Sequence, residues 1–134
     1  MPGKAAKERG KGIAETEWDL LEVLWARETA TAREVADALQ ETRGWAYSTV
    51  KTMLDRLVDK KLVVARKVGS VWEYRAGLER SEARRGAWRR FVDTVFGGSM
   101  APALEFLATD VDLSEGQREK LARLLEPESE DERE

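Results

Sequence analysis

The chain has 134 residues, enough for one domain or two small ones, and it contains neither cysteine nor histidine. These absences exclude disulfides, thiolate metal sites and catalysis by cysteine or histidine, and no acidic cluster has the spacing of a carboxylate-only metal site. We therefore expect no cofactor, no metal and no enzyme activity, while the formal net charge of −3 argues at first sight against DNA binding.

Charge is segregated along the chain. The last nine residues, 126–134, hold six acids and one arginine, a net charge of −5, which leaves +2 for the rest. Residues 43–75 hold eight cations and three acids, a net charge of +5. A basic block confined to one segment favours a nucleic-acid-binding surface. The polar acidic end, residues 127–134, is predicted to be a disordered tail.

The beginning of the chain is basic and has no apolar run. Residues 1–13 are therefore predicted to be a flexible basic arm and not a signal peptide. No later stretch approaches the roughly 18 apolar residues that cross a membrane. We expect a cytoplasmic protein without membrane insertion.

Three helices are predicted next. Trp18, Leu21 and Trp25 recur at helical spacing, which indicates a helix over residues 15–27 with both tryptophans in the core.

Thr31 and Glu34 have the spacing of a capping box, which opens a short helix over residues 32–40. Gly44 breaks this pattern, and a third helix with an apolar stripe is predicted over residues 47–60.

Two β-rich runs follow, at residues 62–68 and 71–76, and Gly69-Ser70 between them predicts a hairpin. A helix, a capped helix, a turn, a third helix and a hairpin, in this order, are typical of a winged helix-turn-helix. We therefore assign residues 14–77 to a winged-helix DNA-binding domain, within a fold that is mostly α (α+β).

In such a domain the third helix enters the major groove with its N-terminal residues near the bases, and the hairpin contacts the phosphate backbone. Lys51, long and cationic, is the best candidate for a contact with a base edge or a phosphate. The candidate DNA-binding residues are Tyr47, Ser48, Thr49, Lys51, Thr52, Arg56, Arg66, Lys67 and Ser70. The alternative is a winged-helix module that binds another protein through a solvated face, and the basic charge of residues 43–75 favours DNA.

Three further helices are predicted in the C-terminal part. Ser81 can cap the first, which runs to about Phe96 and ends at Gly97-Gly98. Ser99 can cap the second.

Ser114 and Gln117 have the spacing of a capping box and open the third C-terminal helix. Short helices cannot bury large apolar stripes alone, so residues 78–126 are predicted to be a helical dimerisation domain. The alternative is that these helices pack back on their own winged helix. The candidate dimerisation residues are Trp88, Phe91, Val92, Val95, Phe96, Leu104, Leu107, Leu121 and Leu124.

Several segments together resemble the penicillinase-repressor (BlaI/MecI) family. They are AETEWDLLEVLW, TAREVADAL, GWAYSTVKTMLDRLVDKKLV, GSVWEYRA and FVDTVFGGSMAPALEFLATDVDLSEGQREKLARLLE, and the resemblance covers residues 13–126. It implies a homodimeric transcriptional repressor with an N-terminal winged helix and a C-terminal dimerisation region. It also implies a palindromic double-stranded DNA operator with TACA/TGTA-type half-sites, upstream of resistance or stress genes.

Some family members are inactivated when a membrane sensor protease triggers their cleavage, so the resemblance makes such a protease a candidate partner. The resistance repressors are cleaved at an Asn-Phe pair, where this chain has Glu105-Phe106. Copper-responsive relatives bind metal through C-terminal cysteines, which this chain lacks. Many members begin the recognition helix with Ser-Pro-Lys, where this chain has Ala46, Tyr47 and Ser48. A cap and a basic contact are thus missing, so operator preference is expected to differ and Lys51 to carry more of the contact.

Overall fold

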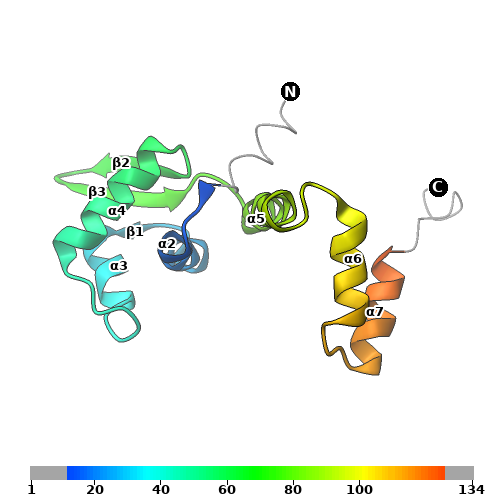
Figure 1. Cartoon of the computed structure of the whole chain (residues 1–134). Helices are drawn as coiled ribbons and strands as arrows, with labels where there is room; N and C mark the ends of the chain where they lie inside the picture. Colours follow the sequence, from blue (N-terminus) through cyan, green and yellow to red (C-terminus); the bar gives the residue numbers. More distant parts are fainter. Residues whose placement is uncertain (1–11, 126–134) are drawn as a thin grey trace, which may run out of the picture. The chain divides into compact units, whose positions relative to one another are not determined.

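The computed structural model describes residues 12–125, which form six helices and three strands (Figure 1). In chain order these are α2 (Glu15–Arg27), β1 (Ala30–Thr31), α3 (Ala32–Ala38), α4 (Tyr47–Asp59), β2 (Val63–Val68), β3 (Val71–Ala76), α5 (Arg80–Val95), α6 (Met100–Thr109) and α7 (Glu115–Leu125). The predicted tail, residues 127–134, and nearly all of the predicted arm, residues 1–13, lie outside the described residues. The chain divides after Gly98 into two compact units.

The first unit contains the predicted winged helix-turn-helix, and the mostly α (α+β) fold class is confirmed. Strands β2 and β3 pair antiparallel from Val63↔Ala76 to Val68↔Val71, so the predicted hairpin turns at two residues. Gly69 lies at the turn with φ of 65°, a conformation that favours glycine.

Strand β1 was not predicted. It adds a third strand beside β3, in the order β1-β3-β2.

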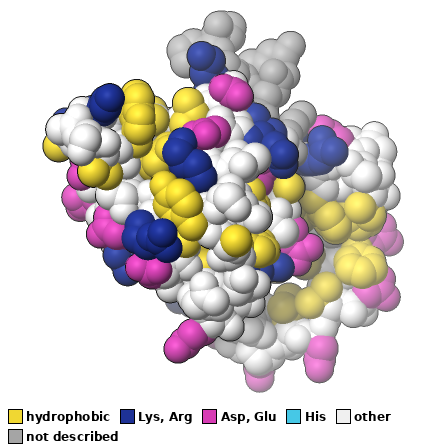
Figure 2. Space-filling model, turned by 90° about the vertical axis from the view of Figure 1, so that its left-hand side faces the viewer, with side chains coloured by type: hydrophobic (Ala, Val, Ile, Leu, Met, Phe, Trp, Pro, Cys, Tyr) yellow, Lys and Arg dark blue, Asp and Glu magenta, His cyan; other side chains and the backbone are white. Residues whose placement is uncertain are grey.

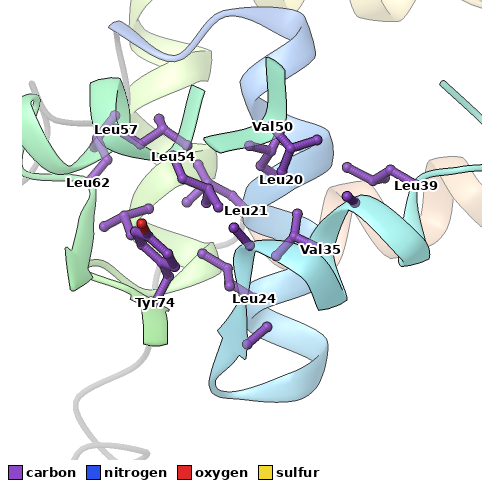
Figure 3. Packing of buried hydrophobic residues seen from close by; sticks show 14 of the residues in the cluster. Leu20, Leu21, Leu24, Val35, Leu39, Val50, Leu54, Leu57, Leu62 and Tyr74 are labelled. Carbon is purple, nitrogen blue, oxygen red and sulfur yellow. The ribbon is translucent and has the colours of Figure 1, made fainter. Parts of the chain in front are cut away.

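The core of the first unit is made by one face of each helix together with the sheet (Figure 3). The apolar positions of α2 and α4 recur every three or four residues, which places them on one side of each helix. Their fully buried members include Leu20, Leu21, Leu24, Val50, Leu54 and Leu57. Trp18 and Trp25 pack against this core but are only half-buried, with ring centroids 5.8 Å apart.

The predicted capping box of α3 is confirmed. The Thr31 hydroxyl accepts from the amide of Glu34 at 3.1 Å, and the Glu34 carboxylate accepts from the amide of Thr31 at 2.9 Å. The hydrogen bond from the Thr31 amide, followed by the interaction with the Thr31 side chain, lowers the pKa of Glu34, because both favour the charged carboxylate. Helix α3 ends at Ala38, two residues before the predicted end at Gln40.

The start of α5 differs from the prediction. Its N-cap residue is Glu79, so Ser81 lies inside the first turn and is not the cap. Other contacts set this start: the Trp25 indole donates to the carbonyl of Leu78 at 2.9 Å, and Arg80 pairs with Glu22 at 2.9 Å.

Ala83 of α5 also belongs to the core cluster. By its contacts, therefore, α5 belongs to the first compact unit and continues it beyond residue 77. The dimerisation role of residues 78–126 stays a prediction.

The second unit consists of α6 and α7. Ser99 occupies the N-cap position of α6, as expected, but its side chain makes no capping hydrogen bond. The capping box before α7 is confirmed: Ser114 Oγ accepts from the Gln117 amide at 3.1 Å, and Gln117 Oε1 accepts from the Ser114 amide at 2.9 Å.

No helix within residues 12–125 is long and apolar enough to cross a membrane. In the same part of the chain, no group of three or more acidic side chains could hold a metal ion.

Candidate nucleic-acid interface

Helix α4 divides cleanly into a buried and an exposed face. Val50, Leu54 and Leu57 are buried in the core, whereas the candidates Ser48, Thr49, Thr52 and Arg56 are exposed. The Thr52 hydroxyl donates to the carbonyl of Ser48 at 2.9 Å, so its proton is already used within the helix. The exposed face therefore offers one cation, Arg56, beside small hydroxyl side chains.

The N-terminus of α4 lacks a capping side chain. Ala46 is the N-cap residue and makes no side-chain hydrogen bond there, as expected from the sequence. Tyr47 follows it with 42% of its surface exposed, and the guanidinium carbon of Arg33 lies 4.6 Å from the centroid of its ring. This places a cation of α3 at the beginning of the predicted recognition helix.

Lys51 lies toward the hairpin. Its Nζ is 2.8 Å and 2.9 Å from the two carboxylate oxygens of Asp55, and 5.7 Å from the ring centroid of Tyr74. The Tyr74 hydroxyl donates in turn to Asp55 at 3.4 Å. The hydrogen bond with Asp55, followed by the contact with Tyr74, raises the pKa of Lys51 above its usual range.

The structure thus gives Lys51 a carboxylate partner within its own helix. A groove between α4 and the hairpin is lined by Lys51, Asp55, Val58, Asp59, Ala65, Trp72 and Tyr74. Lys51 would have to exchange Asp55 for a phosphate or a base to contact DNA. The role of Lys51 as the leading DNA contact stays a prediction. In that role, DNA would compete with the Asp55 carboxylate for Lys51.

The hairpin candidates Arg66 and Lys67 lie on β2, and Ser70 lies at the turn. Arg66 is 3.3 Å from a carboxylate oxygen of Glu73, its cross-strand neighbour. Lys67 and Ser70 are exposed, and no ion pair described within residues 12–125 includes Lys67.

Figure 2 looks onto the side of the molecule that lies at the left of Figure 1, and there Lys and Arg side chains alternate with acidic and hydrophobic ones. Positive charge on this side is therefore local and not continuous.

Arg33 is the residue that sequence reasoning missed. It stands in the first turn of α3, fourteen positions before Tyr47, and no local pattern links the two. Only the packing of α3 against α4 brings the guanidinium onto the ring.

The predicted dimerisation residues fall into two groups. Trp88, Phe91 and Val95 form a stripe on α5 that is 38%, 44% and 56% exposed. The Trp88 and Phe91 rings stack with centroids 5.7 Å apart. Val92, by contrast, is fully buried within the single chain, so it supports the fold and does not belong to the exposed stripe.

The other predicted positions also differ in exposure. Phe96, Leu107 and Leu121 are half-buried, whereas Leu104 and Leu124 are exposed. Leu107, Leu121 and Leu124 line one groove of the second unit.

The three helices and the hairpin define the class of the molecule as a winged-helix protein. Its particular family follows from the sequence. The pattern of the penicillinase repressor family matches residues 13–127, and the chain belongs to this family of DNA-binding transcriptional repressors, the BlaI/MecI family.

Two relatives illustrate the match. The methicillin resistance regulatory protein MecI of Mammaliicoccus sciuri is 26% identical over 114 residues, which cover 84% of this chain and 92% of MecI. The penicillinase repressor of Bacillus licheniformis is 28% identical over 115 residues, covering 85% and 89% of the two chains. Among solved structures, that of hsRosR-S4 has a TM-score of 0.52 at 18% identity and covers 90% of this chain and 92% of its own, which shows a shared fold.

Proposed function

We propose that the protein represses transcription as a homodimer that binds a palindromic operator. The observation that carries the dimer is the exposed stripe of Trp88, Phe91 and Val95 on α5. Two stacked aromatic rings in water are costly to leave exposed, and such patches are characteristic of interfaces. A second copy of the same stripe is the natural cover, because most homodimers use one self-complementary patch on both subunits.

The palindrome follows from the two-fold symmetry. A dimer presents two recognition helices related by the same axis, so its operator repeats with inverted symmetry at about 34 Å, one turn of DNA, or a multiple of it. The family resemblance suggests TACA/TGTA-type half-sites. The unusual residues Ala46, Tyr47 and Ser48 at the start of α4 are where we expect the preference of this repressor to diverge.

The DNA contacts are assigned to two exposed surfaces. Ser48, Thr52 and Arg56 on α4 would face the major groove, while Lys67 and Ser70 on the hairpin would meet the phosphate backbone. A protein that binds the chromosome in this way acts in the cytoplasm.

The dimer is tested by sedimentation of the full chain. Trp88→Glu and Phe91→Glu place a carboxylate in the proposed interface and should convert a dimer into a monomer. Val71→Glu is the matched control, because Val71 is 49% exposed but lies on the hairpin. A full chain that is monomeric before any substitution, or variants that stay dimeric, would contradict the proposed interface.

A shortened chain ending at Ala76 is a weaker test of the same idea. It removes Leu78 and Ala83, both buried in the core of the first unit, so loss of the dimer could follow from unfolding. Substitutions at exposed positions avoid this problem.

A membrane sensor protease is a further candidate partner, which the family resemblance suggests. Glu105 and Phe106 are exposed on α6, in helical backbone that would have to unwind before cleavage. A membrane metalloprotease gene beside the repressor gene would support proteolytic derepression. Recovery of an uncleaved chain from fully induced cells would contradict it.

A further inference from the structure

Six cations in and next to the winged helix already have a carboxylate partner. Within residues 12–125, ion pairs neutralise one group of cations: Arg27, Arg43, Lys51, Lys60, Arg66 and Arg80. Each of these must give up its partner before it can neutralise a DNA phosphate. Arg33 takes part in none of the ion pairs described in this part of the chain, and its one described contact is the face of Tyr47.

The capping of α3 does not explain a cation at this position. Arg33 stands in the first turn of α3, where the partial positive charge of the helix N-terminus disfavours Lys and Arg. The cap of α3 is already complete without it, because Thr31 and Glu34 satisfy each other's amides. Within residues 12–125, no described ion pair offsets this unfavourable position of Arg33, so an anionic partner such as a phosphate would stabilise it.

Tyr47 fixes where the guanidinium lies. A planar guanidinium over an aromatic ring keeps its N–H donors at its edges, free to bind a phosphate in a bidentate manner. Tyr47 is the first residue of α4, so Arg33 is held at the junction between the two helices of the helix-turn-helix. The first helix of such a motif crosses the DNA backbone beside the groove that the second helix enters.

We propose that Arg33, positioned by Tyr47, binds a phosphate of the DNA backbone beside the major groove. This inference rests on the proposed function, because it requires a winged helix that docks α4 into the groove. It adds a residue of α3 to the interface, and it assigns to Tyr47 a positioning role in place of a base contact.

The first test is Arg33→Ala in the full chain, with affinity for an operator fragment and for random-sequence DNA measured at several salt concentrations. Loss of one phosphate contact in each subunit, two per dimer, should weaken both affinities alike, by about tenfold for each contact. It should also reduce the slope of log K against log salt by about two per dimer. Arg84→Ala removes the same charge from an exposed position on α5 and should leave the slope unchanged.

Three results would overturn the assignment. They are an unchanged slope in Arg33→Ala, an equal loss of slope in Arg84→Ala, or a loss confined to operator DNA, which would mean a base contact.

The second test asks whether Tyr47 acts through Arg33. Tyr47→Phe keeps the ring and should bind DNA like the wild type, whereas Tyr47→Ala should lose affinity nearly as far as Arg33→Ala. In the Arg33→Ala background, Tyr47→Ala should cause little further loss, because the two residues act as one unit. Fully additive losses would contradict the positioning role. Thermal unfolding of each variant checks that the fold is intact.

The failure of this inference is distinguishable from that of the proposed function. If the wild-type chain itself shows no salt-dependent DNA binding, the proposed function fails. If the wild type binds and Arg33→Ala behaves identically, only the inference fails.

Discussion

The helices α2, α3 and α4 of the winged helix and the helix α5 that follows it differ in how far they bury their large apolar side chains. In the winged helix, the leucines and valines of α2, α3 and α4 close on one another, and Leu20, Leu54 and Leu57 have no exposed surface (Figure 3). On α5 the large side chains Trp88 and Phe91 are more than one third exposed. The first region completes its core within one chain, whereas the second leaves an apolar surface that a partner would cover.

This difference in burial separates two functions that one chain has to combine, DNA recognition and pairing with a second copy. A recognition helix needs a rigid support that does not depend on assembly, because its side chains must be placed accurately against the groove. Pairing of two such supports needs surface that is apolar but accessible in the single chain. Substitutions in each region test whether the two are as independent as their burial indicates.

The largest effect is expected inside the winged helix. Leu54→Ala removes a fully buried side chain of α4 and should lower the free energy of unfolding by about 3 kcal/mol, through lost burial and a residual cavity. Denaturant titration at a fixed protein concentration measures it. A loss below about 1 kcal/mol would mean that this core is looser than its burial implies.

A comparable effect of a different kind is expected on α5. Phe91→Glu should weaken self-association by about 1.5–3 kcal/mol for each buried ring, with little effect on the unfolding of the single chain. The melting temperature of the wild type should rise with protein concentration, and that of the variant should not. If the melting temperature of the wild type did not change with protein concentration, the proposed role of α5 in self-association would be contradicted.

Local sequence signals predicted the elements of the winged helix well. The bounds of α2, the Thr31–Glu34 box and the hairpin turn at Gly69 depend on periodicity, capping and turn chemistry, which act over a few residues. Strand β1 was missed because its two residues become a strand only through pairing with β3, more than 40 positions later.

The same limit applies to the candidate interface. An ion pair of Lys51 with Asp55 could be inferred from their spacing of four on a helix. The contact of Lys51 with Tyr74 and that of Arg33 with Tyr47 could not, since each depends on how separate elements pack. Likewise the burial of Val92, on the same predicted apolar stripe as Phe91, is decided by tertiary packing.

A smaller difference in DNA affinity is expected between two cations of α4. Lys51 is paired with Asp55, whereas Arg56 is in no ion pair described within residues 12–125. Arg56→Ala should weaken DNA binding by about 1–3 kcal/mol if Arg56 reads a base. Lys51→Ala should cost less, because DNA binding by Lys51 first requires loss of its pair with Asp55. Binding titrations of both variants on operator and random DNA measure the difference. A larger loss for Lys51→Ala would restore Lys51 as the principal contact.

The smallest effect concerns the cap of α3. The pKa of Glu34 is lowered in the folded chain, so its contribution to stability is present above the unfolded pKa and is lost as the pH falls through the folded pKa. Glu34→Gln should therefore reduce stability at neutral pH and flatten its decline below about pH 4.5, where carboxylates begin to protonate. Urea midpoints measured between pH 3 and 7 for both chains provide the comparison. Parallel curves would show that Glu34 contributes nothing to the acid sensitivity.

The most direct test of the proposed dimeric repressor is a titration of the full chain onto operator DNA selected from its own genome, repeated at several salt concentrations. The proposed function predicts two chains per site at saturation and a linear fall of log K with log salt, steeper than a single phosphate contact would give. One chain per palindromic site, or an affinity that does not change with salt, would contradict it.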